Sequence, residues 1–546
     1  MPDEYLNASA LPHVIAQLLY NRGVKPEEIE PFLAADERLE GNPFLLPDIS
    51  QAVNRVYRAV LSREKIAVYG DFDVDGVTAV VILAEGLSRL GGEVLLYIPD
   101  RFSEGHGLNI SAIEKLHAQG ANLVITADCG ITDLTEVKRA QKLGMDVIVT
   151  DHHIQLEKLP QAVAVVDPKR KDSVYPHPDL AGAGVAFKFV QALFHKDSRE
   201  KWLARLLDLV ALATVTDLSP MVGENRYLVK KGLRELNSSS RLGIQEMVKL
   251  AGLKPGRLDI EDISWALGPR LNAAGRVNNA STSYQLLTTQ SQEEARLLAQ
   301  ELEEKNVERQ KLSSEVLGHA REKVAAKVHL PLLMAADESY SIGVIGPVAG
   351  KLVDEFYKPV VMVSLSPEQC KASCRSIAEF DIMSALENCH DLLTAFGGHP
   401  LAAGFTVPRQ NLARLEERLM SLAMDRLGHL DLRPELVVDA ELSLSAFTGD
   451  TFTLMQELSP FGRGNPQPTF LTRQVEVIEC RNFGNQSEWL RLKLKQGNVT
   501  WQAVDFVSQK KRQEIASCID IVYSFERSRW NGEEVLGLKL RDFAPS

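Results

Sequence analysis

The stretch Ile66–Gly76, IAVYGDFDVDG, decides the fold that we expect for this chain. Its first half is an unbroken apolar run, which is typical of a strand buried on both faces of a sheet. Its second half places three carboxylates directly after that strand. Four more apolar runs that end in an acidic residue follow, at 94–100, 123–128, 147–151 and 163–167. Helix-length segments at 77–90, 110–119 and 133–143 separate the first four runs, so the sequence predicts β-α-β units and a mainly parallel sheet.

The acidic residues that end these strands point to one rim of the predicted sheet. In an open parallel sheet, ligands bind outside the carboxyl ends of the strands. Asp71, Asp128 and Asp151 all follow a strand in this way. We therefore expect carboxylates from separate strands to converge there, although no single loop supplies them.

The composition limits the kinds of protein that this chain can be. Its 546 residues carry 61 Lys and Arg against 73 Asp and Glu, a formal net charge of −12. This excludes a surface that is basic all over, so a polyanion would have to meet a local basic patch or metal ions. No run reaches the roughly 18 apolar residues of a membrane span, and the acidic start at Met1–Glu4 is unlike a signal peptide. Six cysteines are too few for a disulfide framework at this length, so we expect a multidomain cytoplasmic protein without a membrane role.

The remaining sequence divides by its pattern. The predicted division is an N-terminal segment 1–50, a parallel-sheet domain 51–225, a helical part 226–290, a connecting helix 291–330, a second α/β lobe 331–430 and a C-terminal β domain 431–546. The connecting helix is rich in Glu, Ala, Leu, Lys and Gln and contains no Pro. The last portion has alternating short runs and turn signals, which are typical of a small β-barrel or sandwich.

The motif that begins at Asp71 has alternatives that must be weighed. An EF-hand calcium loop would need Glu at its twelfth position and an entering helix. The twelfth position is Ile82 and the entry is a strand, so that alternative fails. Two interpretations stay open: a plain acidic turn, or a binding site for Mg²⁺ or Mn²⁺, ions that carboxylates bind well.

Two later motifs strengthen the metal hypothesis. Asp128-Cys129-Gly130 and Asp151-His152-His153 stand at later strand ends. Taken singly, the Asp could be a helix cap and the histidines surface residues. The sheet nevertheless brings both motifs to one rim, and imidazole beside carboxylates favours Mn²⁺ over Ca²⁺. Two metal ions bridged by a shared carboxylate, about 3.5–4 Å apart, are the usual solution for attack on a phosphodiester.

The ordered set of these motifs resembles the DHH phosphoesterase superfamily. The set consists of Asp71-x-Asp73-x-Asp75-Gly76, Asp128-Cys129-Gly130, Asp151-His152-His153 and Asp217. Over nearly its whole length the chain is similar to the bacterial single-strand-specific DNA exonucleases of that superfamily. The stretches that carry this likeness are LGPRLNAAGR at 267–276, GVIG at 343–346, RSI at 375–377, GGH at 397–399 and FGRGNPQP at 461–468.

The resemblance implies a fold and an activity. The implied fold is α/β, with a parallel-sheet DHH lobe and a DHHA1 lobe joined by a long helix, plus a C-terminal OB-fold barrel. The implied activity is a 5′→3′ exonuclease that degrades single-stranded DNA to 5′ mononucleotides in recombination and repair, with two Mn²⁺ or Mg²⁺ ions. Single-stranded DNA would be the substrate, a single-strand-binding protein and a RecQ-type helicase the partners, and a monomer the functional form.

The resemblance also implies roles for individual residues. The implied metal ligands are Asp73, Asp75, Asp128, His152 and Asp217, with Asp128 as the bridge between two ions. Asp71 and His153 would support catalysis at the scissile phosphate. The implied contacts to a 5′ phosphate or to DNA are Arg101, Arg270, Arg276, Ser373, Arg375 and His399. In the barrel, Phe461 and Trp489 could stack on bases or belong to the core.

The chain departs from the family pattern at two places. Tyr340-Ser341 stands where the family usually has Trp-His, and Val277-Asn278-Asn279 follows Arg276, where the family commonly shows an acidic residue. We expect these changes to affect DNA contacts rather than the metal site. Two other functions stay open at this point: a DHH-type phosphodiesterase for short oligonucleotides or cyclic dinucleotides, and a non-catalytic strand-binding scaffold.

Overall fold

The first lobe is built on a five-stranded sheet of order β2-β1-β3-β4-β5, in which every pair is parallel. Its strands are β1 (Lys65–Gly70), β2 (Glu93–Tyr97), β3 (Ala121–Ala127), β4 (Asp146–Thr150) and β5 (Ala164–Val166). The structure is a computed structural model that describes all residues except 102, 196–199, 278–279, 447–448, 484–488, 506–514 and 531–532. The parallel sheet predicted from the apolar runs is confirmed.

Helices cover both faces of this sheet. The covering helices are α4 (Ile49–Leu61), α5 (Val74–Arg89) and α8 (Gly182–Leu193) on one face, and α6 (Ile110–Ala118) and α7 (Leu134–Lys142) on the other. Ile66 and Val68 on β1 pack toward the first group, whereas Ala67 and Tyr69 pack toward the second. This alternation follows from the two-residue period of a strand and explains why the whole run is apolar.

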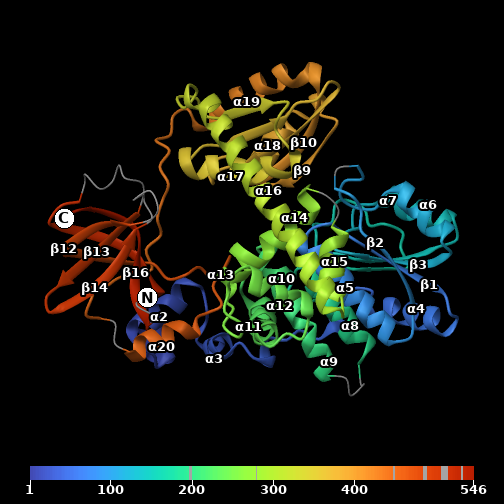
Figure 1. Cartoon of the computed structure of the whole chain (residues 1–546), viewed down its shortest axis with the longest axis horizontal. Coiled ribbons are helices and arrows are strands. Elements are labelled where there is room, and N and C mark those ends of the chain that lie inside the picture. The colour runs from blue at the N-terminus through green and yellow to red at the C-terminus, as the bar shows by residue number, and fades with distance from the viewer. Residues whose placement is uncertain are drawn as a thin grey trace.

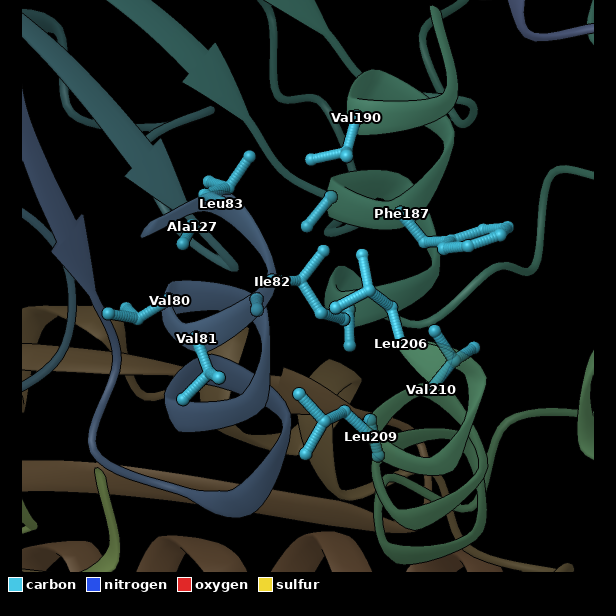
Figure 2. Close-up of a cluster of buried hydrophobic side chains, with 14 of the residues drawn as sticks. Val80, Val81, Ile82, Leu83, Ala127, Phe187, Val190, Leu206, Leu209 and Val210 are labelled. Atoms are coloured by element: carbon cyan, nitrogen blue, oxygen red, sulfur yellow. The ribbon is translucent and has the colours of Figure 1, made fainter. Parts of the chain in front are cut away.

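A helical region continues the larger core. Its elements are α9 (Glu200–Arg205), α10 (Leu207–Thr216), α11 (Gly223–Asn237), α12 (Leu242–Leu250), α13 (Ile260–Asp262), the π-helical turn η4 (Ile263–Leu267), α14 (Gly268–Val277) and α15 (Ser281–Thr288). Figure 2 shows how α5 faces α8 and α10, with Ile82 between Phe187 and Leu209. This packing fixes the start of α5, where the acidic motif lies.

A single long helix connects the two lobes. Helix α16 (Gln292–Ala325) has 34 residues and is capped by Ser291, whose side chain accepts a hydrogen bond from the Glu294 amide. Its first half packs against α12, α14 and α15, and its second half packs against α17 and β6 (Figure 1). A long helix joins the two lobes as expected, and it ends at Ala325.

The second lobe is a mixed sheet of order β6-β7-β8-β10-β9. Its strands are β6 (Leu333–Asp337), β7 (Val360–Ser364), β8 (Gln369–Arg375), β9 (Ala395–His399) and β10 (Ala402–Pro408); its helices are α17 (Ile342–Phe356), α18 (Ile382–Glu387), α19 (Leu412–Leu427) and the short turns η5 (His390–Leu392) and η6 (Arg409–Asn411). Only β6 and β7 pair in parallel among the described strands of this sheet. The glycine-rich stretch near residue 400 forms the β9–β10 hairpin.

The C-terminal domain is a closed barrel. It contains β11 (Ala440–Glu441), α20 (Gly449–Glu457), β12 (Phe470–Phe483), β13 (Trp489–Gln496), β14 (Val499–Asp505), β15 (Cys518–Trp530) and β16 (Glu533–Pro545). The ring runs β12-β13-β14-β16-β15 and closes by pairing of β15 with β12, and β14 and β16 are parallel. This closure decides for a barrel of the OB type over a sandwich.

The N-terminal residues pack on the barrel although they are distant in sequence. The elements there are α1 (Asp3–Ser9), α2 (His13–Asn21), α3 (Ile29–Ala34) and the turns η1 (Pro26–Glu28), η2 (Glu37–Leu39) and η3 (Pro43–Leu45). Leu18, Leu19 and Phe32 share one apolar cluster with barrel residues such as Phe470 (Figure 1). The start of the chain therefore lies between the barrel and the first lobe.

Three polar side chains join the barrel, the N-terminal residues and the first lobe: Arg22, Arg226 and Asn465. We call these side chains, together with the backbone carbonyls of 457–460, the barrel junction. Arg226 on α11 is fully buried and donates to the carbonyls of Phe32, Glu457, Leu458, Ser459 and Pro460. Its guanidinium also lies over the ring of Phe32 at 4.2 Å. A buried cation with its donors satisfied in this way fixes the chain segments around it.

Candidate metal centre and its cationic surroundings

The first acidic motif lies between β1 and α5. Asp73 caps α5 by accepting a hydrogen bond from the Gly76 amide at 3.0 Å, and Asp75 lies in the first helical turn. Asp71 is buried, and its Oδ2 is 2.9 Å from Nδ1 of His106. The alternation of carboxylates thus places one on the strand end, one at the cap and one inside the helix.

Helix α8 holds the carboxylate of Asp75. The amides of Gly182 and Ala183 donate to the two oxygens of Asp75, each at 2.7 Å. These amides have no partner within α8 because they belong to its first turn. The helix N-terminus therefore orients Asp75 and favours its charged form.

Asp128 occupies an unusual backbone position directly after β3. Its φ is +64°, a left-handed conformation that non-glycine residues rarely adopt, and its side chain is buried. A Cβ atom on Gly182 would lie 2.6 Å from the Cβ of Asp128, so only glycine fits at the start of α8. The close approach of α8 thus fixes both Asp75 and Asp128.

His152 faces both of these carboxylates. Its Nδ1 lies 2.9 Å from the carbonyl of Leu180, which assigns the proton of a neutral ring to Nδ1. Its Nε2 is then a lone pair that lies 3.0 Å from Asp128 Oδ1 and 3.7 Å from Asp75 Oδ2. Lone pairs facing each other at this distance call for a proton or a metal ion between them.

Asp151 supports the histidines. Its carboxylate accepts from the Ile131 and His152 amides at 2.9 and 2.7 Å and lies 2.7 Å from Nδ1 of His153. Burial alone would raise the pKa of Asp151, but the hydrogen bond and charge of His153 outweigh it and lower the pKa. The same contact raises the pKa of His153 to about 9 against the opposing effect of burial.

Asp217 completes the cluster from the helical region. It is the C-cap of α10, is exposed, and accepts a hydrogen bond from Ser219 Oγ at 2.6 Å. Ligand atoms within 4.8 Å of one another form three groups: Asp71, Asp73 and Asp128; Asp75, His152 and Asp217; and Asp128, His152 and His153. The structure thus brings together all seven residues predicted for the metal centre and its catalytic support.

The protein leaves the negative charge of this cluster largely uncompensated. Burial, followed by the nearby charge of Asp71, raises the pKa of Asp73, and burial and Asp217 raise the pKa of Asp75 to about 7. Burial and the charge of Asp75 raise the pKa of Asp128 well above its ordinary range. Perturbation by burial and like charges at one rim is typical of a functional site.

These residues fit divalent cations. Asp71 Oδ1 and Asp128 Oδ1 are buried and accept no hydrogen bond from any described residue. Carboxylate oxygens together with an imidazole nitrogen are ligands that Mn²⁺ accepts, and carboxylates suit Mg²⁺. The shared position of Asp128 in two of the three groups agrees with the predicted bridging role, which remains a prediction.

A group of arginines lies beside the acidic motif. Arg101 follows β2, and its guanidinium lies 4.9 Å from the ring centre of Phe72. Burial lowers the pKa of Arg101, whereas the charges of Asp71 and Asp73 raise it, so these groups are neighbours. Arg276 on α14 donates to the carbonyl of Gly343 at 3.2 Å.

The charges of these arginines repel one another. Burial first, then Arg101, Arg309 and Arg375, lower the pKa of Arg276 to about 10, and only Asp73 opposes them. We call these four residues the arginine group: Arg101 of the first lobe, Arg276 of α14, Arg309 of α16 and Arg375 of β8. These cations form no ion pair with any described residue, and cations gathered in this way form a site for an anion such as a phosphate.

The second lobe contributes Ser373 and Arg375 to this group. Both belong to β8, and Arg375 donates to Ser373 Oγ at 3.3 Å and to the Cys374 carbonyl at 2.8 Å. A Cβ atom on Gly346 of α17 would lie 3.2 Å from Ser373 Oγ and 3.4 Å from Arg375. The glycine of the GVIG stretch therefore keeps the space in front of these donors open.

Two other predicted DNA contacts lie apart from this group. Arg270 is engaged with Glu303 on α16 at 2.5 Å and with the Ala266 carbonyl at 2.9 Å. His399 ends β9 and is exposed. Burial, Lys169, His153 and Arg463 lower its pKa and Asp217 raises it, so His399 faces the metal centre from the second lobe.

Sequence reasoning missed several residues of the site. His106, Gly182 and Arg309 were not singled out. Gly182 is the first residue of a helix, and a glycine at that place can indicate that another part of the chain packs closely against the helix. Arg309 looks like any charged residue of a solvated helix. The partner of His106 lies 35 residues away, and no local pattern indicates it.

The departures from the family pattern have different outcomes. Tyr340 is buried in the second lobe, where Lys323 lies 5.6 Å from its ring centre, so it packs rather than faces DNA. Asn278 and Asn279 lie outside the described residues. Phe461 packs against the barrel core, and the ring centre of Trp489 lies 5.4 Å from that of Phe483. Within the described ranges, no helix combines the length and apolar character of a membrane span.

Three sequence families match this chain. They are the DHH family, N-terminal domain, over residues 65–214; the DHHA1 domain over 323–424; and the RecJ OB domain over 438–542. Their order is that of the first lobe, the second lobe and the barrel.

RecJ exonucleases are among the proteins similar to this chain in both sequence and structure. The chain is 36% identical over 539 residues to the single-stranded-DNA-specific exonuclease RecJ of Bacillus subtilis, covering 98% of this chain and 68% of that protein. Its fold is similar to RecJ from Thermus thermophilus solved with Mn²⁺, with a TM-score of 0.83, 27% identity, and coverage of 100% and 78%. The Mg²⁺ complex of the same protein gives a TM-score of 0.78 at 26% identity, with coverage of 100% and 76%.

Proposed function

The chain belongs to the RecJ family of single-stranded-DNA-specific exonucleases, and on that premise we propose that it removes nucleotides from the 5′ end of single-stranded DNA. It is a phosphodiester hydrolase that uses Mn²⁺ or Mg²⁺. The family relationship favours this activity over a dinucleotide phosphodiesterase. A non-catalytic scaffold would have lost metal-binding side chains, and the five expected ones are present.

The observation that carries the 5′→3′ direction is the position of the arginine group. Arg101 lies 4.9 Å from the ring centre of Phe72, which stands between Asp71 and Asp73, and Gly275, the neighbour of Arg276, packs against the Phe72 carbonyl. A terminal phosphate bound by Arg276, Arg375 and Ser373 would place the first internucleotide bond toward the carboxylates. Arginine suits this task because its planar fork of donors matches phosphate oxygens.

The chain's own residues prepare the hydrolytic site. Asp73, Asp75, Asp128, His152 and Asp217 would hold two divalent ions, which supply an activated water and stabilise the charge of the transition state. The amides at the start of α8 hold Asp75, and the Leu180 carbonyl fixes the His152 ring. Asp71 and His153 would contact the scissile phosphate from the two ends of the cluster. The products would be 5′ mononucleotides.

The cellular setting is proposed on the family relationship alone. It supports a role in DNA recombination and repair, in the cytoplasm where such a substrate occurs. A single-strand-binding protein and a RecQ-type helicase would supply single strands, and a monomer would suffice because one chain contributes every residue of the site.

A digest of end-labelled DNA tests the proposal. With Mn²⁺, a 5′-labelled single strand should release labelled mononucleotide at once, whereas a 3′-labelled strand should shorten progressively. Asp128→Ala should release nothing and still bind the strand. Release of the 3′ label first would contradict the direction, and turnover only of dinucleotides would support the phosphodiesterase alternative.

A further inference from the structure

The loop Pro460–Pro466, which leads into the barrel, contacts the turn that follows Asp217. The carbonyl of Arg463 accepts a hydrogen bond from the Met221 amide at 2.7 Å, four residues after Asp217. A Cβ atom on Gly462 would lie 2.6 Å from Cγ of Met221. The loop therefore packs directly on the turn that follows a predicted metal ligand.

The barrel junction fixes this loop from behind. Asn465 is fully buried, and its amide donates to the carbonyls of Leu458 and Pro460 at 2.8 Å each. Its Oδ1 accepts from Nε of Arg22 at 2.8 Å. Together with the bonds from Arg226 to the carbonyls of 457–460, these contacts hold the loop backbone in one place.

The side chain of Arg463 is exposed and has no ion-pair partner among the described residues. After burial, the charges of Lys169 and Arg463 both lower the pKa of His399, so both cations act on the same histidine. Lys169 follows β5, is half-buried, and likewise forms no ion pair in the part of the chain that the structure describes. The Val166 carbonyl on β5 accepts a hydrogen bond from the Asp151 amide at 3.1 Å, so Lys169 lies beside the strand end that carries His152 and His153.

These cations border a different part of the metal centre from the arginine group. Lys169 follows β5, which pairs beside the strand end at Asp151, and the Arg463 carbonyl binds the turn after Asp217, whereas Arg101 lies over the ring of Phe72. The arginine group neighbours Asp71 and Asp73, whereas Lys169, His399 and Arg463 neighbour the histidines and Asp217. A strand with its 5′ phosphate in the arginine group would pass the metal centre and leave on this side. In a chain of net charge −12, two cations that form no ion pair with the described residues suit a polyanion at this place.

We propose that Arg463 and Lys169 bind the first phosphate on the 3′ side of the scissile bond, opposite His399. The inference rests on the proposed exonuclease function and deepens it. The loop before the barrel then belongs to the active site, and the junction serves to place Arg463. The arginine group would hold the phosphate on the 5′ side of the scissile bond, and Arg463 with Lys169 would hold the phosphate on its 3′ side.

A strand with one neutral linkage tests the inference. The substrates are 5′-phosphorylated 20-mers with a phosphate or an uncharged methylphosphonate at the second linkage, and the readout is single-turnover release of the first nucleotide. The wild type should prefer the charged linkage about 10- to 100-fold, the usual range for a charge-assisted hydrogen bond. Arg463→Gln and Lys169→Gln should each reduce that preference, the double variant should remove it, and Arg463→Lys should retain more of it than Arg463→Gln.

Two controls separate binding from structure. Arg414→Gln removes an exposed arginine on α19 and should keep the full preference. A methylphosphonate at the eighth linkage should leave the ranking of the variants unchanged. Equal slowing of both substrates by Arg463→Gln, or no preference in the wild type, would overturn the inference. Failure of the wild type to release any nucleotide would instead refute the proposed function.

Discussion

The metal centre and the barrel junction both bury charged side chains, but they treat the charge in opposite ways. At the junction, carbonyl oxygens accept from every nitrogen of the Arg226 guanidinium. At the metal centre, buried carboxylates repel one another, and two buried oxygens accept no hydrogen bond from described residues. Compensated charge therefore indicates a structural role here, whereas uncompensated charge indicates a site for a ligand.

Asp128→Asn should have the largest effect on activity and little effect on folding. Loss of a metal ligand should cost more than the roughly 10- to 100-fold that follows loss of an outer partner of such a ligand. Because the substitution removes a repelled charge, the metal-free variant should unfold at the same temperature as the wild type or higher. Single-turnover hydrolysis and thermal unfolding in EDTA measure the two effects. A variant that is both active and unstable would contradict the comparison.

Arg226→Met should show the opposite pattern. It leaves several buried carbonyls without donors, and removal of one partner from a buried charged network costs about 3–5 kcal/mol of unfolding free energy. The exposed pair of Arg433 and Asp431 offers a matched control, since Arg433→Met should change stability by less than about 0.5 kcal/mol. Denaturant unfolding followed on the barrel tryptophans gives the comparison. Equal stability of the Arg226→Met and Arg433→Met variants would contradict the structural role assigned to Arg226.

The two regions also differ in how far the sequence predicts them. The metal centre follows from strands that end in aspartate, because parallel pairing brings strand ends to one rim whatever the loops do. The sequence pattern does not predict the role of Arg226, because it lies in an ordinary charged helix and its partners are over 190 residues away in the chain. Asp217 stands between these cases, since only the family resemblance singled out an exposed helix cap.

The pH dependence of stability should distinguish the regions in the metal-free protein. The pKa of Asp75 is about 7 in the folded state against an ordinary value of 3.8, so the folded state binds its proton more tightly than the unfolded state. Its contribution to stability is therefore complete below about pH 4 and is lost as the pH rises through about 7. Arg226 remains charged over this range, because its pKa is lowered only to about 10.

Thermal unfolding from pH 5 to pH 8 measures this effect. In EDTA the unfolding temperature should fall as the pH rises, and Asp75→Asn should reduce the fall. With Mn²⁺ the fall should disappear, because a bound cation stabilises the ionised carboxylates. The change should be smaller than that of Arg226→Met, since the cluster can share protons among its members. A wild-type curve in EDTA that rises over this range would contradict the assignment.

Asn465→Ala should destabilise the protein less than Arg226→Met does, and it should have the most selective effect on activity. It removes two donated bonds and leaves one guanidinium nitrogen of Arg22 without its partner, which costs about 1–3 kcal/mol for a buried polar group. Because Arg226 still holds the carbonyls of 457–460, the fold should persist while the loop that carries Arg463 loosens. The variant should then lose preference for a charged second linkage, as Arg463→Gln does, although Arg463 itself is intact. Unchanged preference with reduced stability would show that the junction braces the barrel without placing Arg463.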